Sequence, residues 1–338
     1  MNKLYVKIFC GLLCGLLLLS SLTACATRGA IKSTKEELMV VGTVDGYEVL
    51  YEELRFVTLM YRAQLEDQYG KGIWDDPTTA EQYRAELEDL VMRNVTANYA
   101  VLSLCRAVGI TPDAREITEA VDQYINELIS EVGGRAAYKK ALQEQGLTDN
   151  FLRFTIATDY CQNELYYSYT QDLGLIETDQ DVIYDYIMEG NFIRTVHVYI
   201  QNDAGDNIEQ NRAAAEDVYR RLGEGEDINK IIGSSVNEDF DLTTTNGYYF
   251  TRGEMISAYE DAAFALEVGE FSQVVETQSG FYVIKRLPLE ASYVLTNLTT
   301  LINQYQFALL NKFIDDRQAE LVFEFNEYGA GLDLTKIK

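Results

Sequence analysis

Histidine is nearly absent from this sequence: His197 is the single imidazole among 338 residues. One histidine excludes a metal site built from several imidazoles, and no cluster of other metal ligands surrounds it in the sequence. It also disfavours a serine or cysteine hydrolase, because no nucleophile motif accompanies it. We therefore expect a protein that uses neither a metal nor another cofactor.

Positive charge is scarce as well. The chain carries 28 Lys and Arg residues against 54 Asp and Glu residues, which gives a formal net charge of −26. This charge would repel a phosphate backbone, so nucleic acid is excluded as a natural partner. It would also repel an anionic membrane, so attachment to a membrane needs something other than a basic patch. The simpler meaning of the charge is solubility.

Long hydrophobic runs are missing except near the start of the chain. Two lysines there precede an apolar run over residues 8–19, which is too short for a transmembrane helix and is typical of a secretory signal. The run ends in Leu22-Thr23-Ala24-Cys25, which reads as the lipobox of a bacterial lipoprotein. We therefore predict a signal peptide over residues 1–24, a lipid on Cys25, and attachment to the extracytoplasmic face of the cell membrane. A chance cysteine after an ordinary signal peptide is the alternative.

Few cysteines remain once the signal peptide is removed. Cys10 and Cys14 leave with it and Cys25 would carry the lipid, so the folded part retains Cys105 and Cys161. Both lie in helical patterns, and the sequence is compatible with two buried thiols or with a disulfide between them. The mature chain would carry 26 basic against 54 acidic residues, a net charge of −28.

The sequence does contain enough apolar material for two domains, since 47% of its residues are hydrophobic and 12% are aromatic. A polar stretch over residues 25–38 suits a flexible tether behind the lipid. Residues 40–50 then form two β-rich runs joined by Asp45-Gly46, a strong hairpin signal. Apolar residues recur at helical spacing over residues 80–108 and 112–132, and shorter helical patterns continue to residue 188.

A different pattern begins at residue 193 with a strand over residues 193–200. Alternation along this strand places His197 and Tyr199 on the face opposite to its valines. Helices are predicted at 209–222, 227–232 and 258–266, and strands at 247–250, 273–276 and 281–286. After Pro288 the chain returns to a helical pattern.

The segment from Gly253 to Arg286 resembles a known family. Its turn Gly253-Glu254-Met255, its run from Tyr259 to Leu266, its turn Val268-Gly269-Glu270, and Ser279-Gly280 before a last apolar run resemble the second half of a parvulin-type peptidyl-prolyl isomerase domain. The hairpin at residues 40–50, with the later runs GGRAAYKKALQEQGL and ETDQDVIYDYI, resembles the N-terminal module of SurA- and PrsA-like foldases.

The resemblance implies an α+β fold in which a parvulin-type domain is inserted in a helical SurA/PrsA-like chaperone module. That domain would have a four-stranded antiparallel sheet with flanking helices. The implied segments are residues 39–190 for the N-terminal helical module, 191–288 for the isomerase domain, and 289–338 for a C-terminal helical segment that completes the module.

The resemblance also implies a site for an X-Pro bond. Its apolar cradle would include Met255, Tyr259 and Phe250. Its polar, catalytic side would include His197, Thr277, Ser279 and the acidic pair Glu238 and Asp239. Tyr282 stands where catalysing members usually carry a second histidine, and its hydroxyl could keep one hydrogen bond to His197. Ordinary core packing is the alternative for the cradle, and a structural role is the alternative for His197.

We therefore predict a membrane-anchored foldase that binds unfolded secreted proteins and isomerises their X-Pro bonds. A phosphoserine preference is disfavoured, because Gln201-Asn202-Asp203 stands where phosphate-directed members carry basic residues. The main alternative is a holdase chaperone without catalysis, since Tyr282 replaces the second histidine. A solute-binding lipoprotein is a more distant alternative, because the sequence lacks its alternating βαβ pattern. A homodimer through the helical module is compatible with the sequence.

Overall fold

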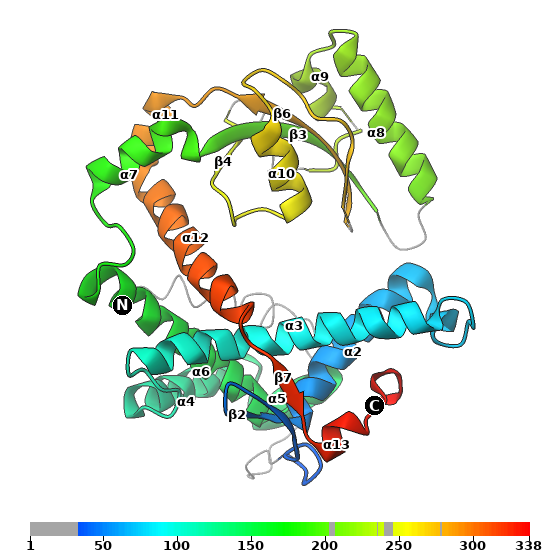
Figure 1. Cartoon of the computed structure of the whole chain (residues 1–338), viewed down its shortest axis with the longest axis vertical. Coiled ribbons are helices and arrows are strands. Elements are labelled where there is room, and N and C mark those ends of the chain that lie inside the picture. Colours follow the sequence, from blue (N-terminus) through cyan, green and yellow to red (C-terminus); the bar gives the residue numbers. More distant parts are fainter. Residues whose placement is uncertain (1–32, 203–206, 235, 240–245, 278) are drawn as a thin grey trace. The chain divides into compact units, whose positions relative to one another are not determined.

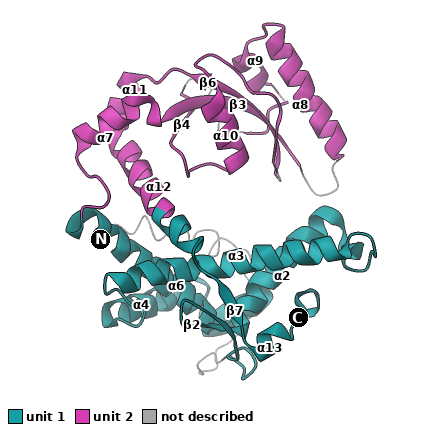
Figure 2. Cartoon of the chain, viewed as in Figure 1, with its two compact units in different colours: residues 1–173, 313–338 teal, residues 174–312 magenta. Residues whose placement is uncertain are grey.

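The computed structural model describes residues 33–202, 207–234, 236–239, 246–277 and 279–338 (Figure 1). The chain divides into two compact units. Unit 1 consists of Met1–Leu173 with Phe313–Lys338, and unit 2 of Gly174–Lys312 (Figure 2). The predicted lipid site at Cys25 lies outside the described residues. Within the part that is described, no helix combines the length and the apolar character needed to cross a membrane.

A three-stranded sheet in unit 1 joins strands that are far apart in the sequence (Figure 1). The predicted hairpin forms strands β1 (Val40–Val44) and β2 (Tyr47–Leu50), and its Asp45-Gly46 turn has positive φ angles of 49° and 80°. Strand β7 (Phe323–Phe325) pairs with the other side of β1, and helix α13 (Glu327–Ala330) follows it. The C-terminal residues therefore complete the sheet that the hairpin begins.

The rest of unit 1 is mainly helical. Helix α3 (Ala80–Ala107) buries Leu87, Val91 and Val95, as the apolar spacing predicts. The other helices are α2 (Tyr51–Tyr69), α4 (Arg115–Glu131), α5 (Arg135–Glu144) and α6 (Asp149–Tyr167), with short helical turns at Lys71–Trp74, Ser168–Asp172 and Leu334–Lys336.

The two cysteines of the folded part meet where α3 packs against α6. Both thiols are buried and free, and Cys105 Sγ donates a hydrogen bond to the carbonyl oxygen of Cys161 at 3.3 Å. A hydrogen bond with Cys161, together with burial, raises the pKa of the Cys105 thiol. The structure therefore contains two buried thiols and no disulfide between them.

Unit 2 is built on a four-stranded antiparallel sheet in the order β4-β3-β6-β5. Alternation along β3 decides what each face contacts. Val196 and Val198 pack against α8 and α9, whereas Ile193 packs on the side of α10. The elements are β3 (Ile193–Gln201), α8 (Ile208–Gly223), α9 (Ile228–Ile232), β4 (Tyr248–Phe250), α10 (Ser257–Ala265), β5 (Val275–Thr277) and β6 (Gly280–Leu287).

Unit 2 extends beyond this sheet and its helices. Helix α7 (Gln180–Tyr186) precedes β3, while α11 (Ala291–Thr296) and α12 (Leu298–Gln318) follow β6. Buried Ile183 and Leu301 belong to one apolar cluster that joins these helices. Unit 2 is therefore wider than the predicted segment 191–288, and α12 continues from it into unit 1.

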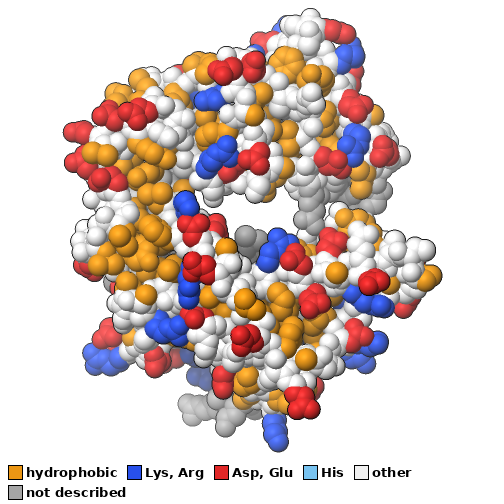
Figure 3. Space-filling model, in the orientation of Figure 1, with side chains coloured by type: hydrophobic (Ala, Val, Ile, Leu, Met, Phe, Trp, Pro, Cys, Tyr) orange, Lys and Arg blue, Asp and Glu red, His pale blue; other side chains and the backbone are white. Residues whose placement is uncertain are grey.

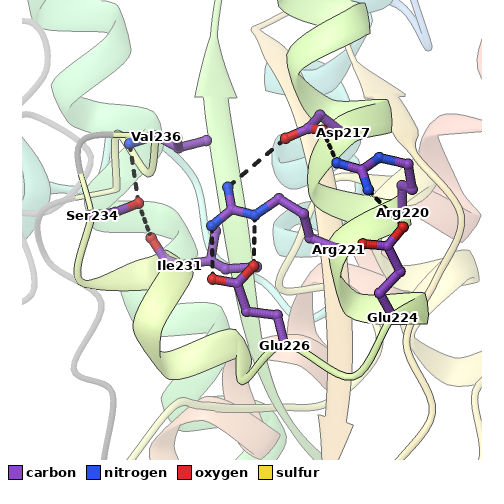
Figure 4. Close-up of polar contacts among 8 residues, drawn as sticks. All are labelled: Asp217, Arg220, Arg221, Glu224, Glu226, Ile231, Ser234 and Val236. Carbon is purple, nitrogen blue, oxygen red and sulfur yellow. Dashed lines mark hydrogen bonds and ion pairs between the residues drawn. The ribbon is translucent and has the colours of Figure 1, made fainter.

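The surface carries the acidic excess of the sequence. Asp and Glu side chains are spread over both units on the face drawn in Figure 3. Several of the basic side chains are ion-paired, as at the corner between α8 and α9 (Figure 4). There, Arg221 donates to both carboxylate oxygens of Glu226 at 2.8 and 2.9 Å, and Arg220 donates to Asp217 and Glu224 at 2.6 Å each. Solvent screens such exposed pairs, so they order this corner more than they stabilise it.

Candidate active site

His197 lies in the middle of β3 and is 6% exposed. Its Nε2 lies 2.9 Å from Asp239 Oδ2, and its Nδ1 lies 2.9 Å from the Tyr259 hydroxyl. Tyr248 also donates to Asp239 Oδ2 at 2.9 Å, and the Thr195 and Tyr259 hydroxyls are 2.9 Å apart. The histidine is therefore the centre of a continuous chain of polar side chains.

The chemistry of the partners assigns the protons of a neutral His197. A carboxylate only accepts, so Nε2 carries the hydrogen that bonds to Asp239. Nδ1 then accepts the phenol proton of Tyr259, whose oxygen in turn accepts from Thr195. This arrangement fixes both the tautomer and the orientation of the imidazole.

Aromatic rings enclose the imidazole. Tyr248 stacks on it with centroids 5.5 Å apart and planes 9° apart. Tyr259 and Tyr282 meet it nearly at right angles, at 82° and 85°. Both imidazole nitrogens are therefore bonded to protein groups, and little of the ring is exposed.

Tyr282 lies opposite Tyr199 in the register of β6 and β3, and the two rings stack with centroids 4.4 Å apart. Burial raises the pKa of Tyr282 to about 12, with a hydrogen bond from Ser279 acting in the opposite direction. Its hydroxyl therefore stays protonated at neutral pH. The hydroxyl that is hydrogen-bonded to His197 Nδ1 is that of Tyr259.

The other predicted polar residues occupy two places. Thr277 and Ser279 flank the β5–β6 turn, where the Thr277 hydroxyl donates to the Gly280 carbonyl oxygen at 2.8 Å and lies 3.2 Å from the Ser279 hydroxyl. Glu238 accepts from the backbone N–H of Gln201 at 2.6 Å. Of the acidic pair, Asp239 therefore contacts His197, whereas Glu238 contacts the backbone of β3.

The residues predicted as an apolar cradle share one cluster with α10 and β6. Phe250 is fully buried and Tyr259 is 3% exposed, whereas Met255 is only partly buried. Hydrogen bonds fix the turn that contains Met255. Glu260 Oε1 accepts the backbone N–H groups of Gly253, Glu254 and Met255 at 2.8 Å each. Met255 is therefore the most exposed of the three.

Sequence reasoning missed Thr195 and Tyr248. Thr195 shares the strand face of His197 and Tyr199, so the same alternation would have found it. No sequence pattern pointed to Tyr248. It reaches His197 because β4 lies very close to β3 at this point. A Cβ on Gly247 would lie 2.4 Å from the Thr195 carbonyl oxygen, so only glycine allows this approach.

Residues 197–287 match the family model described as the PPIC-type PPIASE domain. Unit 2 therefore carries a parvulin-type peptidyl-prolyl cis-trans isomerase domain, with the four-stranded antiparallel sheet predicted from the sequence.

The chain as a whole is similar to PrsA foldases. It is 24% identical over 267 residues to foldase protein PrsA of Caldanaerobacter subterraneus subsp. tengcongensis, covering 75% of this chain and 76% of that protein. It is 22% identical over 269 residues to foldase protein PrsA of Clostridium perfringens, covering 77% and 74%. A crystal structure of PrsA from Bacillus anthracis aligns with 66% of this chain and 94% of that chain, at 15% identity and a TM-score of 0.34.

Proposed function

We propose that this chain is a lipid-anchored, extracytoplasmic foldase whose parvulin-type domain isomerises X-Pro bonds in unfolded secreted proteins. The observation that carries this proposal is the complete hydrogen-bonded chain around His197, inside the segment that matches the isomerase family. The PrsA names of the relatives support the foldase part.

Isomerisation needs shape and electrostatics more than reactive groups. Rotation about an X-Pro bond has a barrier of about 18–20 kcal/mol and requires no bond to the enzyme. Met255 would hold the pyrrolidine ring, while the hydroxyls of Tyr282, Ser279 and Thr277 supply hydrogen bonds for the twisted amide. His197 and Asp239 would keep the floor of this site rigid.

The test is catalysed exchange between the cis and trans forms of an X-Pro peptide, followed by NMR with the chain from Ala26 onward. We expect exchange in the wild type and a marked loss in His197→Ala. Tyr282→His should keep or raise the rate, since it restores the residue usual in the family. Absence of exchange in both wild type and Tyr282→His would reject the isomerase.

A second function is favoured by Tyr282 itself. Its ring and that of Tyr248 fill space beside His197, which suits a holdase that grips chains without catalysis. A holdase suppresses aggregation of an unfolded protein and leaves the rate of proline-limited refolding unchanged. Exchange that appears only in Tyr282→His would establish this alternative.

The membrane anchor and the assembly state need separate tests. Cys25→Ala should release the protein from the membrane fraction, and mass spectrometry of the wild type should find acyl chains on Cys25. A homodimer would show as a doubled mass in sedimentation of the chain from Ala26 onward.

A further inference from the structure

The sheet of unit 1 ends at β7, a three-residue strand that carries one charged side chain, Glu324. Within the described residues, no strand lies beyond β7. The Asn326 N–H donates to the Val41 carbonyl oxygen at 3.1 Å, so residues 324 and 326 bond toward β1. Alternation then turns the backbone N–H and C=O groups of Phe323 and Phe325 toward the open edge. Neither proline nor lysine interrupts residues 321–326, so the edge can accept another strand.

A groove lies beside the start of this edge. It has a volume of about 520 Å³ and is bounded by α3, the end of α12 and the residues that enter β7. Met92, Ala319 and Val322 contribute apolar surface to it, and Val322 is 68% exposed. The Gln318 side chain links the two helices by donating to the Arg93 carbonyl oxygen at 2.6 Å. A groove of this size can take a few apolar side chains.

Charge on the edge strand selects what can pair with it. Glu324 is exposed, and its row across the sheet continues through Thr43 to exposed Glu48. Opposite charges in neighbouring strands stabilise a pair, while like charges destabilise it. A strand added to β7 is therefore favoured when it carries a basic residue near Glu324. A second copy paired through the same edge would bring two Glu324 carboxylates into one row.

We propose that the edge of β7, with its groove, binds an extended unfolded polypeptide as an added strand and prefers apolar residues that alternate with Lys or Arg. Main-chain hydrogen bonds form with any sequence, so such a site can bind many polypeptides. The groove adds a preference for apolar side chains, and Glu324 adds one for Lys or Arg. The nature of the occupant rests on the proposed foldase function.

The probe is a short peptide in which valine alternates with lysine, added to the chain from Ala26 onward. Controls are a valine-glutamate peptide and a valine-lysine peptide with alternate backbone amides methylated. We expect the lysine peptide to bind at least about threefold more tightly than the glutamate peptide. The methylated peptide should not bind, and exchange of the Phe323 and Phe325 amides should slow in the complex.

Variants test the charge preference. Glu324→Lys should reverse the order of the two peptides, whereas Glu131→Lys, which changes the net charge equally on exposed α4, should not. Equal binding of the methylated peptide, or protection confined to other residues, would overturn the proposal. Slow exchange at Phe323 and Phe325 that depends on protein concentration without peptide would assign the edge to a second copy and equally overturn it.

The same samples separate this site from the proposed function. Glu324→Lys should leave catalysed exchange of a short X-Pro peptide unchanged, because that substrate does not need β7. A wild type that suppresses aggregation without protection at β7 would retain the foldase and lose this site. A wild type that neither isomerises nor suppresses aggregation would reject the foldase, whatever the peptide result at β7.

Discussion

Each nitrogen of His197 has a hydrogen-bond partner, and each partner has a second one. Tyr259 also bonds with Thr195, and Asp239 also accepts from Tyr248. These groups are largely withdrawn from water, where an unpaired donor or acceptor is destabilising. Loss of one hydroxyl should therefore affect both the fold and the floor of the site.

Tyr259→Phe removes the phenol proton that His197 Nδ1 accepts and keeps the ring. We expect a loss of about 1–3 kcal/mol in the free energy of unfolding, because buried groups lose their partner. Catalysed X-Pro exchange should fall about tenfold. Urea unfolding and NMR exchange measure the two effects, and ¹⁵N shifts of the imidazole would report a changed tautomer.

Tyr249→Phe is the matched control in the same unit. The Tyr249 hydroxyl is buried and makes no hydrogen bond of good geometry with the described residues, although the Glu290 backbone N–H lies close to it. Its removal should leave stability unchanged or raise it by up to about 1 kcal/mol, and exchange should stay the same. If both variants lost exchange equally, the hydroxyl chain around His197 would not be the cause.

At the scale of elements, the turn before α10 depends on one carboxylate. Glu260 is 6% exposed and accepts three backbone N–H groups from the Met255 turn. Glu260→Ala should destabilise unit 2 by about 1–3 kcal/mol and speed amide exchange at residues 253–255. Glu260→Gln, which keeps an acceptor, should lose less. Unchanged amide exchange in Glu260→Ala would contradict this role.

The join between β4 and β3 depends on Gly247. Its φ is +67°, and a Cβ there would meet the Thr195 carbonyl oxygen at 2.4 Å. Gly269 has a φ of +96° with no atom within 4 Å of its added Cβ, so Gly269→Ala reports backbone strain alone, about 1–2 kcal/mol. Gly247→Ala should lose clearly more stability in thermal unfolding and displace Tyr248 from His197. Equal losses would show that the close approach does not matter.

The sequence predicted these elements better than it predicted their side-chain partners. Period 2 along residues 193–200 correctly separated His197 from the valines. It could not distinguish Glu238 from Asp239. The two acids are adjacent in sequence, and only the path of their loop alongside β3 decides which of them reaches His197. Nor could it show that Tyr259, expected in the apolar cradle, would use its hydroxyl to hold His197.

At the scale of the whole molecule, stability should depend on pH through Glu53. This carboxyl is 3% exposed and accepts from Tyr99 at 2.7 Å and Asn98 at 3.3 Å. Burial raises its pKa from 4.5 to about 7, and the nearby Glu52 carboxyl adds to the rise. In the unfolded chain, Glu53 ionises at lower pH than in the folded chain.

The free energy of unfolding should therefore fall as pH rises from 4.5 to about 7, and then remain low. The total contribution of Glu53 is about 3 kcal/mol. Glu53→Gln stays neutral and should remove most of this slope in urea unfolding of unit 1. A slope as steep in the variant as in the wild type would assign the effect to other groups.

The limits of the two compact units leave no mark in the sequence pattern. Apolar residues along α12 recur without a break, so the pattern contains no mark between Lys312 and Phe313, where the units divide. Periodicity shows that a helix face needs partners, but it does not say which part of the chain provides them.

The pairing of β7 with β1 has a consequence for the order in which the protein forms. Unit 2 is one continuous stretch, Gly174–Lys312, so all of its residues are made before the chain is finished. The sheet of unit 1 needs Phe323–Phe325, which are synthesised after every residue of unit 2. Domains fold as units during synthesis. We therefore expect the isomerase domain to be folded before β7 pairs with the N-terminal hairpin.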